Sequence, residues 1–197
     1  MKVLSVGVLS LFGCHDDGPD GAQVYGDYCA LCHGQNGEGY LADRANALAN
    51  PEFLASADIR FLDESTRYGR PGTSMSAWSE DEGGPLTSEE IEAAVAFIQE
   101  WATLDAVEVD DFEADGDPVA GQLIYDQECA SCHGEDGVGV SAVSLGNPEF
   151  LRVASDGFIL YGIQMGRSGT TMGAYSHFSD NELEDVVTAI RAWEDSE

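Results

Sequence analysis

Two short segments of this 197-residue chain carry the same reactive residues at the same spacing. Each reads Cys-x-x-Cys-His, and the second lies 100 residues after the first. Two thiols separated by two residues can form thioether bonds to the two vinyl groups of one porphyrin, and the adjoining histidine can then ligate its iron. The pattern therefore predicts two covalently attached c-type haems. The predicted attachment residues are Cys29, Cys32, His33, Cys129, Cys132 and His133.

Two other chemistries also use paired cysteines. A thioredoxin-like redox pair contains Cys-x-x-Cys, but it needs no following histidine. A four-cysteine zinc site would have to draw its two halves from segments that each look like a complete unit. The duplicated motif, with both histidines, favours haem attachment over these alternatives.

A fifth cysteine, Cys14, ends an apolar stretch near the N-terminus. Lys2 precedes an apolar run over residues 3–12, which has the layout of a secretory signal and is too short to span a bilayer. The ending Leu-Phe-Gly-Cys resembles a bacterial lipoprotein signal; an ordinary cleaved signal or a retained apolar terminus are the alternatives. We expect residues 1–17 to be a signal and tether, the protein to be exported, and a lipid on Cys14 to anchor it to a membrane.

The rest of the chain also repeats, at offsets that fall from 100 to 92 residues. The residues missing from the second copy lie between the matched blocks, where surface loops tolerate deletion. The matched positions are Gly21 with Gly121, Tyr25 with Tyr125, Asn50–Leu54 with Asn147–Leu151, Gly69–Met75 with Gly166–Met172, and Trp101 with Trp193.

This repeat predicts two like domains, at residues 18–104 and 117–197. The segment between them, residues 105–116, is acidic and has no helical stripe, so we expect a linker. A domain of this size has a marginal apolar core, and a haem would supply the missing part of it.

Helical signals dominate both halves. Capping boxes are expected at Thr87–Glu90 and Ser179–Glu182, where a hydroxyl and a carboxylate bond the first amides of a helix. Apolar side chains at helical spacing follow both boxes. Nothing alternates for long enough to form a sheet, so the expected fold class is all-α. The other helices are expected at residues 19–31 and 117–131, running into the cysteine motifs, and as short segments beginning near Pro51 and Pro148.

Each half resembles a class I cytochrome c domain, and the whole resembles a dihaem cytochrome c of the cytochrome c4 type. The attachment motifs, the Gly-Arg-x-Gly-Thr-x-Met block and the closing helix carry this resemblance. It implies that each domain wraps around one haem. It also implies that the first and last helices cross closely, at Gly21 and Gly121, which have no side chain at the contact.

The family's sixth iron ligand is a methionine on a loop before the last helix, and Met75 and Met172 occupy that place. Met165 and His177 are competitors that have no counterpart in the first half. Ligation by histidine and methionine closes both axial positions and favours electron transfer over catalysis. The proline whose carbonyl commonly holds the proximal histidine is missing here, so another carbonyl must orient each ring.

The chain has 37 acidic and 8 basic residues, and its formal charge is −29. This charge disfavours nucleic acid and anionic lipid surfaces as partners. The acidic clusters would steer a redox protein or a membrane oxidoreductase with a basic docking surface, or they reflect a saline habitat.

We therefore expect an electron carrier rather than an enzyme, passing single electrons between redox proteins in the periplasm or at the outer face of a membrane. One alternative is a tightly bound cytochrome subunit of a respiratory or photosynthetic oxidoreductase complex. A dihaem peroxidase-type enzyme, which needs an open iron, and a structural module of a haem filament are the others.

Overall fold

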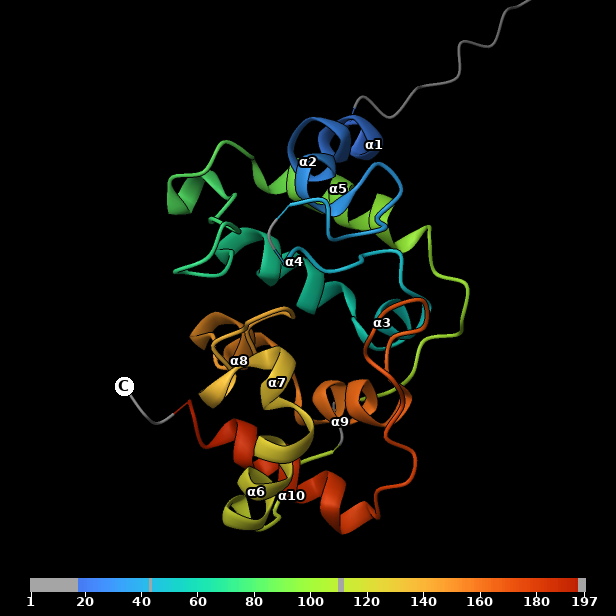
Figure 1. The fold of residues 1–197 in the computed structure, drawn as a ribbon. Helices are drawn as coiled ribbons and strands as arrows, with labels where there is room; N and C mark the ends of the chain where they lie inside the picture. The colour runs from blue at the N-terminus through green and yellow to red at the C-terminus, as the bar shows by residue number, and fades with distance from the viewer. Residues whose placement is uncertain (1–17, 43, 110–111, 195–197) are drawn as a thin grey trace, which may run out of the picture.

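A computed structural model describes residues 18–42, 44–109 and 112–194. Within these ranges the chain is helical, and the one pairing of strand type is an isolated bridge between Ser79 and Leu86. Two helical units lie one above the other (Figure 1). The all-α expectation is confirmed. The proposed signal and the lipidation residue Cys14 fall outside the described residues.

The first helical segment of the upper unit leads directly into the first cysteine motif. It consists of α1 (Gly21–Val24), a π-helical turn, η1 (Tyr25–Cys29), and α2 (Ala30–His33). Asp20 caps its start by accepting hydrogen bonds from the Ala22 and Gln23 amides. The predicted helix is present, with a wider turn at Cys29 than regular α-geometry would give.

The lower unit repeats this arrangement with α6 (Pro118–Glu128), α7 (Ala130–His133) and the short turn η3 (Glu135–Gly137). Asp117 is the N-cap and Pro118 occupies the first turn, where its missing amide costs no hydrogen bond. The second cysteine motif thus follows a helix capped in the same way as the first.

The closing helices are α5 (Ser88–Gln99) and α10 (Asp180–Arg191), and both begin with the predicted capping boxes. They cross the first helices closely. A Cβ atom on Gly21 would lie 2.1 Å from the Ala93 carbonyl oxygen, and one on Gly121 would lie 1.9 Å from that of Asp185. Only glycine permits these two approaches, as expected for crossing helices.

Two helices, rather than one, fill the middle of each unit. The upper unit has α3 (Pro51–Ser56) and α4 (Ile59–Tyr68), and the lower unit has α8 (Pro148–Val153) and α9 (Asp156–Met165). The sequence predicts the short helices that begin at Pro51 and Pro148, α3 and α8, but not α4 and α9. Asp58 and Ser155 cap these additional helices and so mark where each begins.

The two units meet through equivalent residues. The Asn50 side-chain amide donates to the Ser168 carbonyl oxygen at 2.9 Å, and the Asn147 amide donates to the Pro71 carbonyl oxygen at 2.8 Å. Asn50 and Asn147 are repeat counterparts, as are Pro71 and Ser168, so each unit gives the other the same hydrogen bond. The units are therefore related by an approximate twofold axis, with α4 of the upper unit facing α8 of the lower (Figure 1).

The connector at residues 105–116 has no helix among its described residues and hydrogen-bonds to both units. The Val107 amide donates to the Ala55 carbonyl oxygen at 2.8 Å, and the Ala114 amide donates to the Asp156 carboxylate at 2.7 Å. These contacts seat the connector against the helices on either side of the interface.

Candidate haem-attachment sites

The four motif cysteines are partly buried and none is in a disulfide. Burial, followed by the effect of the neighbouring Cys32 thiol, raises the pKa of Cys29 to about 11. Burial is also the main cause that raises the pKa of Cys129 to about 11. A redox-active Cys-x-x-Cys pair needs a cysteine with a lowered pKa, so these environments do not suit thioredoxin-like chemistry.

The two motif histidines are buried and oriented in the same way. His33 Nδ1 lies 2.9 Å from the Asn46 carbonyl oxygen, and His133 Nδ1 lies 2.9 Å from the Val143 carbonyl oxygen. Because a carbonyl only accepts, Nδ1 carries the proton and Nε2 keeps its lone pair for a metal. Burial, the larger cause, lowers the pKa of His33, and the neutral ring is the form that ligates iron.

Asn46 and Val143 supply the carbonyl groups that orient the two histidines in place of the expected proline. Sequence reasoning did not identify them, because any residue can offer a carbonyl and only the loop path decides which one reaches the ring. Gly34 and Gly134 begin these loops with φ of 87° and 85°. Their carbonyl oxygens accept hydrogen bonds from the buried Tyr25 and Tyr125 hydroxyls, which fixes the start of each loop.

In each unit, a tyrosine and a tryptophan that the repeat matches pack against each other next to the motif. Tyr25 packs edge-on against Trp101, with ring centroids 5.0 Å apart, and Tyr125 packs the same way against Trp193 at 4.8 Å. Each tyrosine therefore links the closing helix to the loop that carries the histidine's hydrogen-bond acceptor.

The two predicted methionines lie on loops with the same backbone hydrogen bonding. The Arg70 amide donates to the Met75 carbonyl oxygen at 2.6 Å, and the Arg167 amide donates to the Met172 carbonyl oxygen at 2.9 Å. Both methionines are partly buried. The structure thus places Met75 and Met172 in equivalent positions, and their ligation of iron stays a prediction.

The two competing ligands stand on exposed positions. Met165 ends α9 with 46% of its surface exposed. His177 is exposed and packs against the Phe178 ring, with centroids 4.7 Å apart. Met165 aligns with Tyr68 in the upper unit, and no histidine there corresponds to His177.

Haem c fits the types of donor that each unit carries: two thiols, an oriented neutral imidazole and a thioether on a matched loop. In the part of the chain that the structure describes, no three side chains of the histidine, cysteine, aspartate or glutamate types are grouped closely enough to hold a metal ion by themselves. No described helix is both long enough and apolar enough to cross a bilayer.

Two tandem all-α units, each with a haem-attachment motif, a carbonyl-oriented histidine and a methionine loop, define a c-type cytochrome of two domains. A family model described as "Cytochrome C oxidase, cbb3-type, subunit III" matches residues 13–98 and 116–188. The chain belongs to this family. The cofactor that this family implies is haem c.

Sequence relatives carry the same family's names. The chain is 33% identical over 137 residues to the cbb3-type cytochrome c oxidase subunit CcoP of Azospirillum sp. (strain B510), an alignment covering 64% of this chain and 42% of that protein. It is 30% identical over 176 residues to CcoP of Rhodobacter capsulatus, covering 81% of this chain and 54% of that protein. The chain therefore spans about half the length of these relatives.

A solved structure shares the fold of this chain. The reducing HAO-like protein complex Kustc0457/Kustc0458 of Kuenenia stuttgartiensis contains a chain that matches with a TM-score of 0.56 at 21% identity, over 88% of this chain and 95% of that one. This similarity concerns the fold alone. Reduced recombinant cytochrome c4 from Pseudomonas stutzeri matches 88% of this chain and 98% of its own at 21% identity, but its TM-score of 0.28 is too low to support an argument.

Proposed function

We propose that this chain is a dihaem c-type cytochrome that passes single electrons as the cytochrome subunit of a membrane-bound respiratory oxidase complex. The observation that carries the proposal is the family match over both halves of the chain, each with its own attachment motif. A freely diffusing carrier between redox proteins was the first expectation from sequence. The subunit assignment takes precedence because the matched relatives are named as oxidase subunits.

In this proposal each domain holds one haem, whose iron supplies reversible one-electron redox chemistry. Cys29 and Cys32 would tether the first haem, and His33 and Met75 would ligate its iron. With a histidine and a methionine both holding the iron, no ligand position would be left open for oxygen or peroxide. This supports electron transfer over a peroxidase-type activity.

The second domain uses its equivalent residues in the same roles. Cys129 and Cys132 tether the haem, and His133 and Met172 ligate its iron. The Val143 carbonyl holds His133 in the orientation that the Asn46 carbonyl gives to His33. The two sites are therefore built alike, and each haem would accept and pass on one electron.

The proposed location is the periplasm-facing side of a membrane, with the lipid on Cys14 as an anchor. The formal charge of −29 supports a docking partner with a basic surface and disfavours nucleic acid. Association with such a partner should weaken as salt is added, since exposed charges are screened over about 10 Å at 0.1 M ionic strength.

Affinity purification of the tagged full-length chain from native membranes, in mild detergent and at low salt, tests the subunit assignment. We expect stoichiometric co-purification of membrane oxidase subunits that oxidise the reduced chain in turnover. A chain that purifies alone from the same membranes, yet is rapidly oxidised when a separate redox protein is added, would instead be a diffusing carrier.

A further inference from the structure

Two arginines, Arg70 and Arg167, differ in their surroundings from four other arginines of this acidic chain. They are repeat counterparts in the Gly-Arg-x-Gly-Thr-x-Met blocks, and both are partly buried next to the interface between the units. Four other arginines form ion pairs with carboxylates: Arg60 with Asp58, Arg67 with Asp63, Arg152 with Glu64 and Glu149, and Arg191 with Asp156. Among the described residues, neither Arg70 nor Arg167 has such a partner.

Aromatic rings and backbone surround the two guanidinium groups. The Arg70 guanidinium lies 5.9 Å from the ring centroids of both Phe61 and Phe150. That of Arg167 lies 5.8 Å from the Phe158 centroid. These rings attract a cation, but they do not neutralise it.

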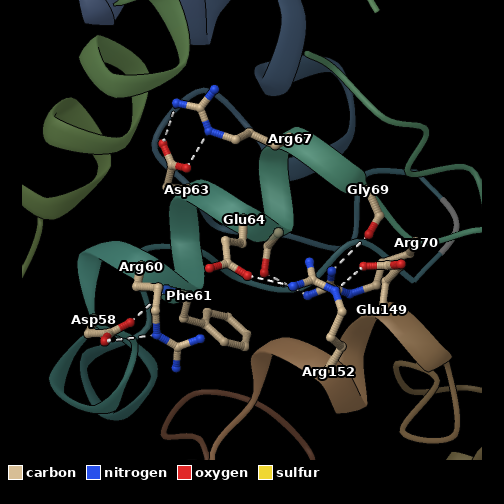
Figure 2. Close-up of polar contacts among 11 residues, drawn as sticks. Asp58, Arg60, Phe61, Asp63, Glu64, Arg67, Gly69, Arg70, Glu149 and Arg152 are labelled. Atoms are coloured by element: carbon tan, nitrogen blue, oxygen red, sulfur yellow. Dashed lines mark hydrogen bonds and ion pairs between the residues drawn. The ribbon is translucent and has the colours of Figure 1, made fainter. Parts of the chain in front are cut away.

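The polar contacts of the two groups are also neutral. Arg70 donates to the Gly69 carbonyl oxygen at 2.8 Å and to the Ser65 hydroxyl at 2.7 Å. Arg167 donates to the Gly166 carbonyl oxygen at 2.9 Å. Figure 2 shows Arg70 hydrogen-bonded to the neighbouring Gly69 carbonyl oxygen. The nearby Arg152 donates hydrogen bonds to the carboxylates of Glu64 and Glu149. A guanidinium has five donor hydrogens, so both groups keep donors for another acceptor.

Both arginines are cationic at neutral pH despite their surroundings. Burial, the dominant cause, lowers the pKa of Arg70 to about 10 and also lowers that of Arg167. Glu149 acts on Arg70 and Glu52 acts on Arg167 across the interface, each opposing the effect of burial. An enclosed cation without an ion-pair partner is costly, so an anion from outside the polypeptide is the expected complement.

We infer that Arg70 and Arg167 each bind a propionate carboxylate of the haem in their own domain. The inference rests on the proposed two-haem function. The backbone hydrogen bonds from Arg70 to Met75 and from Arg167 to Met172 close each loop, so the arginine and the proposed iron ligand belong to one rigid turn. Arginine's planar fork suits a carboxylate, and this charge-assisted bond is stronger than a neutral one.

The two sites differ at one position. Arg70 bonds to the Ser65 hydroxyl, whereas the repeat counterpart of Ser65 is Gly162. A Cβ atom on Gly162 would lie 2.8 Å from Arg167 Nη2. Gly162→Ala therefore displaces the Arg167 guanidinium without changing any charge, and it provides a second variant for the test.

The test measures the reduction potentials of both haems in the full-length holoprotein. Removing a cation from beside a propionate favours ferric iron, so Arg70→Gln should lower the potential of the haem on Cys29 and Cys32, and Arg167→Gln that of the haem on Cys129 and Cys132. We expect the one-electron equilibrium to shift about tenfold, or about 59 mV. Arg→Lys should recover part of the shift, and Gly162→Ala should lower only the second haem's potential.

Arg60→Gln is the matched control, because it removes the same charge from a group already paired with Asp58 on the surface. Retention of the near-infrared sulfur-to-iron band would show that the methionine ligand is intact while the potential falls. The inference is overturned if Arg70→Gln and Arg167→Gln shift the potentials no more than Arg60→Gln, or shift the haem of the opposite domain. Two haems per chain in those variants would show that the proposed function survives such a result.

Discussion

The rings of Phe61 and Phe158 stack across the interface between the two domains, with centroids 4.4 Å apart and planes 25° from parallel. The two residues are counterparts in the repeat, from α4 and α9. A residue that stacks on its own counterpart lies close to the axis that relates the domains. The interface is therefore built on the internal symmetry of the chain, with the asparagine bonds flanking this stack.

Replacing Phe61 with alanine should weaken the contact between the domains. Removing a large buried aromatic side chain costs about 3–5 kcal/mol, because it leaves a cavity beside Phe158. We expect a lower free energy of unfolding and a larger radius of gyration by small-angle scattering. Phe97→Ala is the control, since Phe97 packs against Tyr25 and Trp101 inside one domain. It should destabilise the protein without expanding it, and equal expansion in both variants would refute the role of the stack.

The Asn50→Asp substitution separates the two roles of the Asn50 side chain, which are capping α3 and bonding to the other domain. Its oxygen caps α3 by accepting from the Phe53 amide at 2.9 Å, and its amide donates to Ser168 across the interface. Aspartate keeps the cap but loses the donor and places a negative oxygen opposite a carbonyl, so we expect a loss of about 1–3 kcal/mol in chemical denaturation. Asn147→Asp should cost a similar amount because it makes the equivalent change. An unchanged free energy of unfolding in both variants would show that the two interdomain asparagine hydrogen bonds do not stabilise the protein.

The capping box of α5 predicts a dependence of stability on pH. Hydrogen bonds from the Thr87 amide and then the Thr87 hydroxyl lower the pKa of Glu90 below its ordinary value of 4.5. A carboxylate with a lowered folded-state pKa stabilises the fold above the unfolded-state pKa, and that contribution is lost as the pH falls through the folded-state pKa. The melting temperature of the wild type should therefore exceed that of Glu90→Gln at neutral pH, and the difference should vanish in acid.

Glu89→Gln serves as the control for this measurement, because it removes the same charge from the same turn of α5 without touching the box. If the melting temperature of the wild type still exceeds that of Glu90→Gln by the same amount at a pH well below 4.5, the ionised Glu90 carboxylate is not the cause of the difference.

The methionine ligands can be assigned one haem at a time. Met75→Ala and Met172→Ala should each remove one haem's share of the near-infrared band and lower that haem's potential, since thioether ligation favours ferrous iron. Met165→Ala should leave the band intact, because Met165 is exposed at the end of α9. Loss of the band in Met165→Ala, or its survival in both other variants, would disprove the ligand assignment.

Local patterns predicted the parts of this fold that are decided locally. The cysteine motifs and the capping boxes at Thr87 and Ser179 each act through their own neighbours in the chain. Gly21 and Gly121 instead contact the distant residues Ala93 and Asp185, and the family resemblance rather than a local pattern predicted these crossings. The helices α4 and α9 were not predicted from the sequence. Their N-caps, Asp58 and Ser155, follow directly on another short helix, so each pair of helices looked like a single segment.

The features of the site that the sequence did not predict depend on tertiary structure. The carbonyl groups of Asn46 and Val143 orient the histidines, and a backbone carbonyl has no signature in a sequence. The stacking of Phe61 on Phe158 depends on how the domains meet, which the repeat alone does not determine. The arginines of the methionine blocks were visible as part of a motif, but their lack of a carboxylate partner was visible only in three dimensions.

The central claim is that two haems are covalently attached to this chain, one in each domain. Intact-mass measurement with pyridine haemochrome quantitation of the native protein tests it most directly. We predict two haem c groups per chain, falling to one in Cys29→Ala/Cys32→Ala and to one in Cys129→Ala/Cys132→Ala. A native protein with fewer than two haems, with free thiols at these four cysteines or with bound zinc would contradict the account.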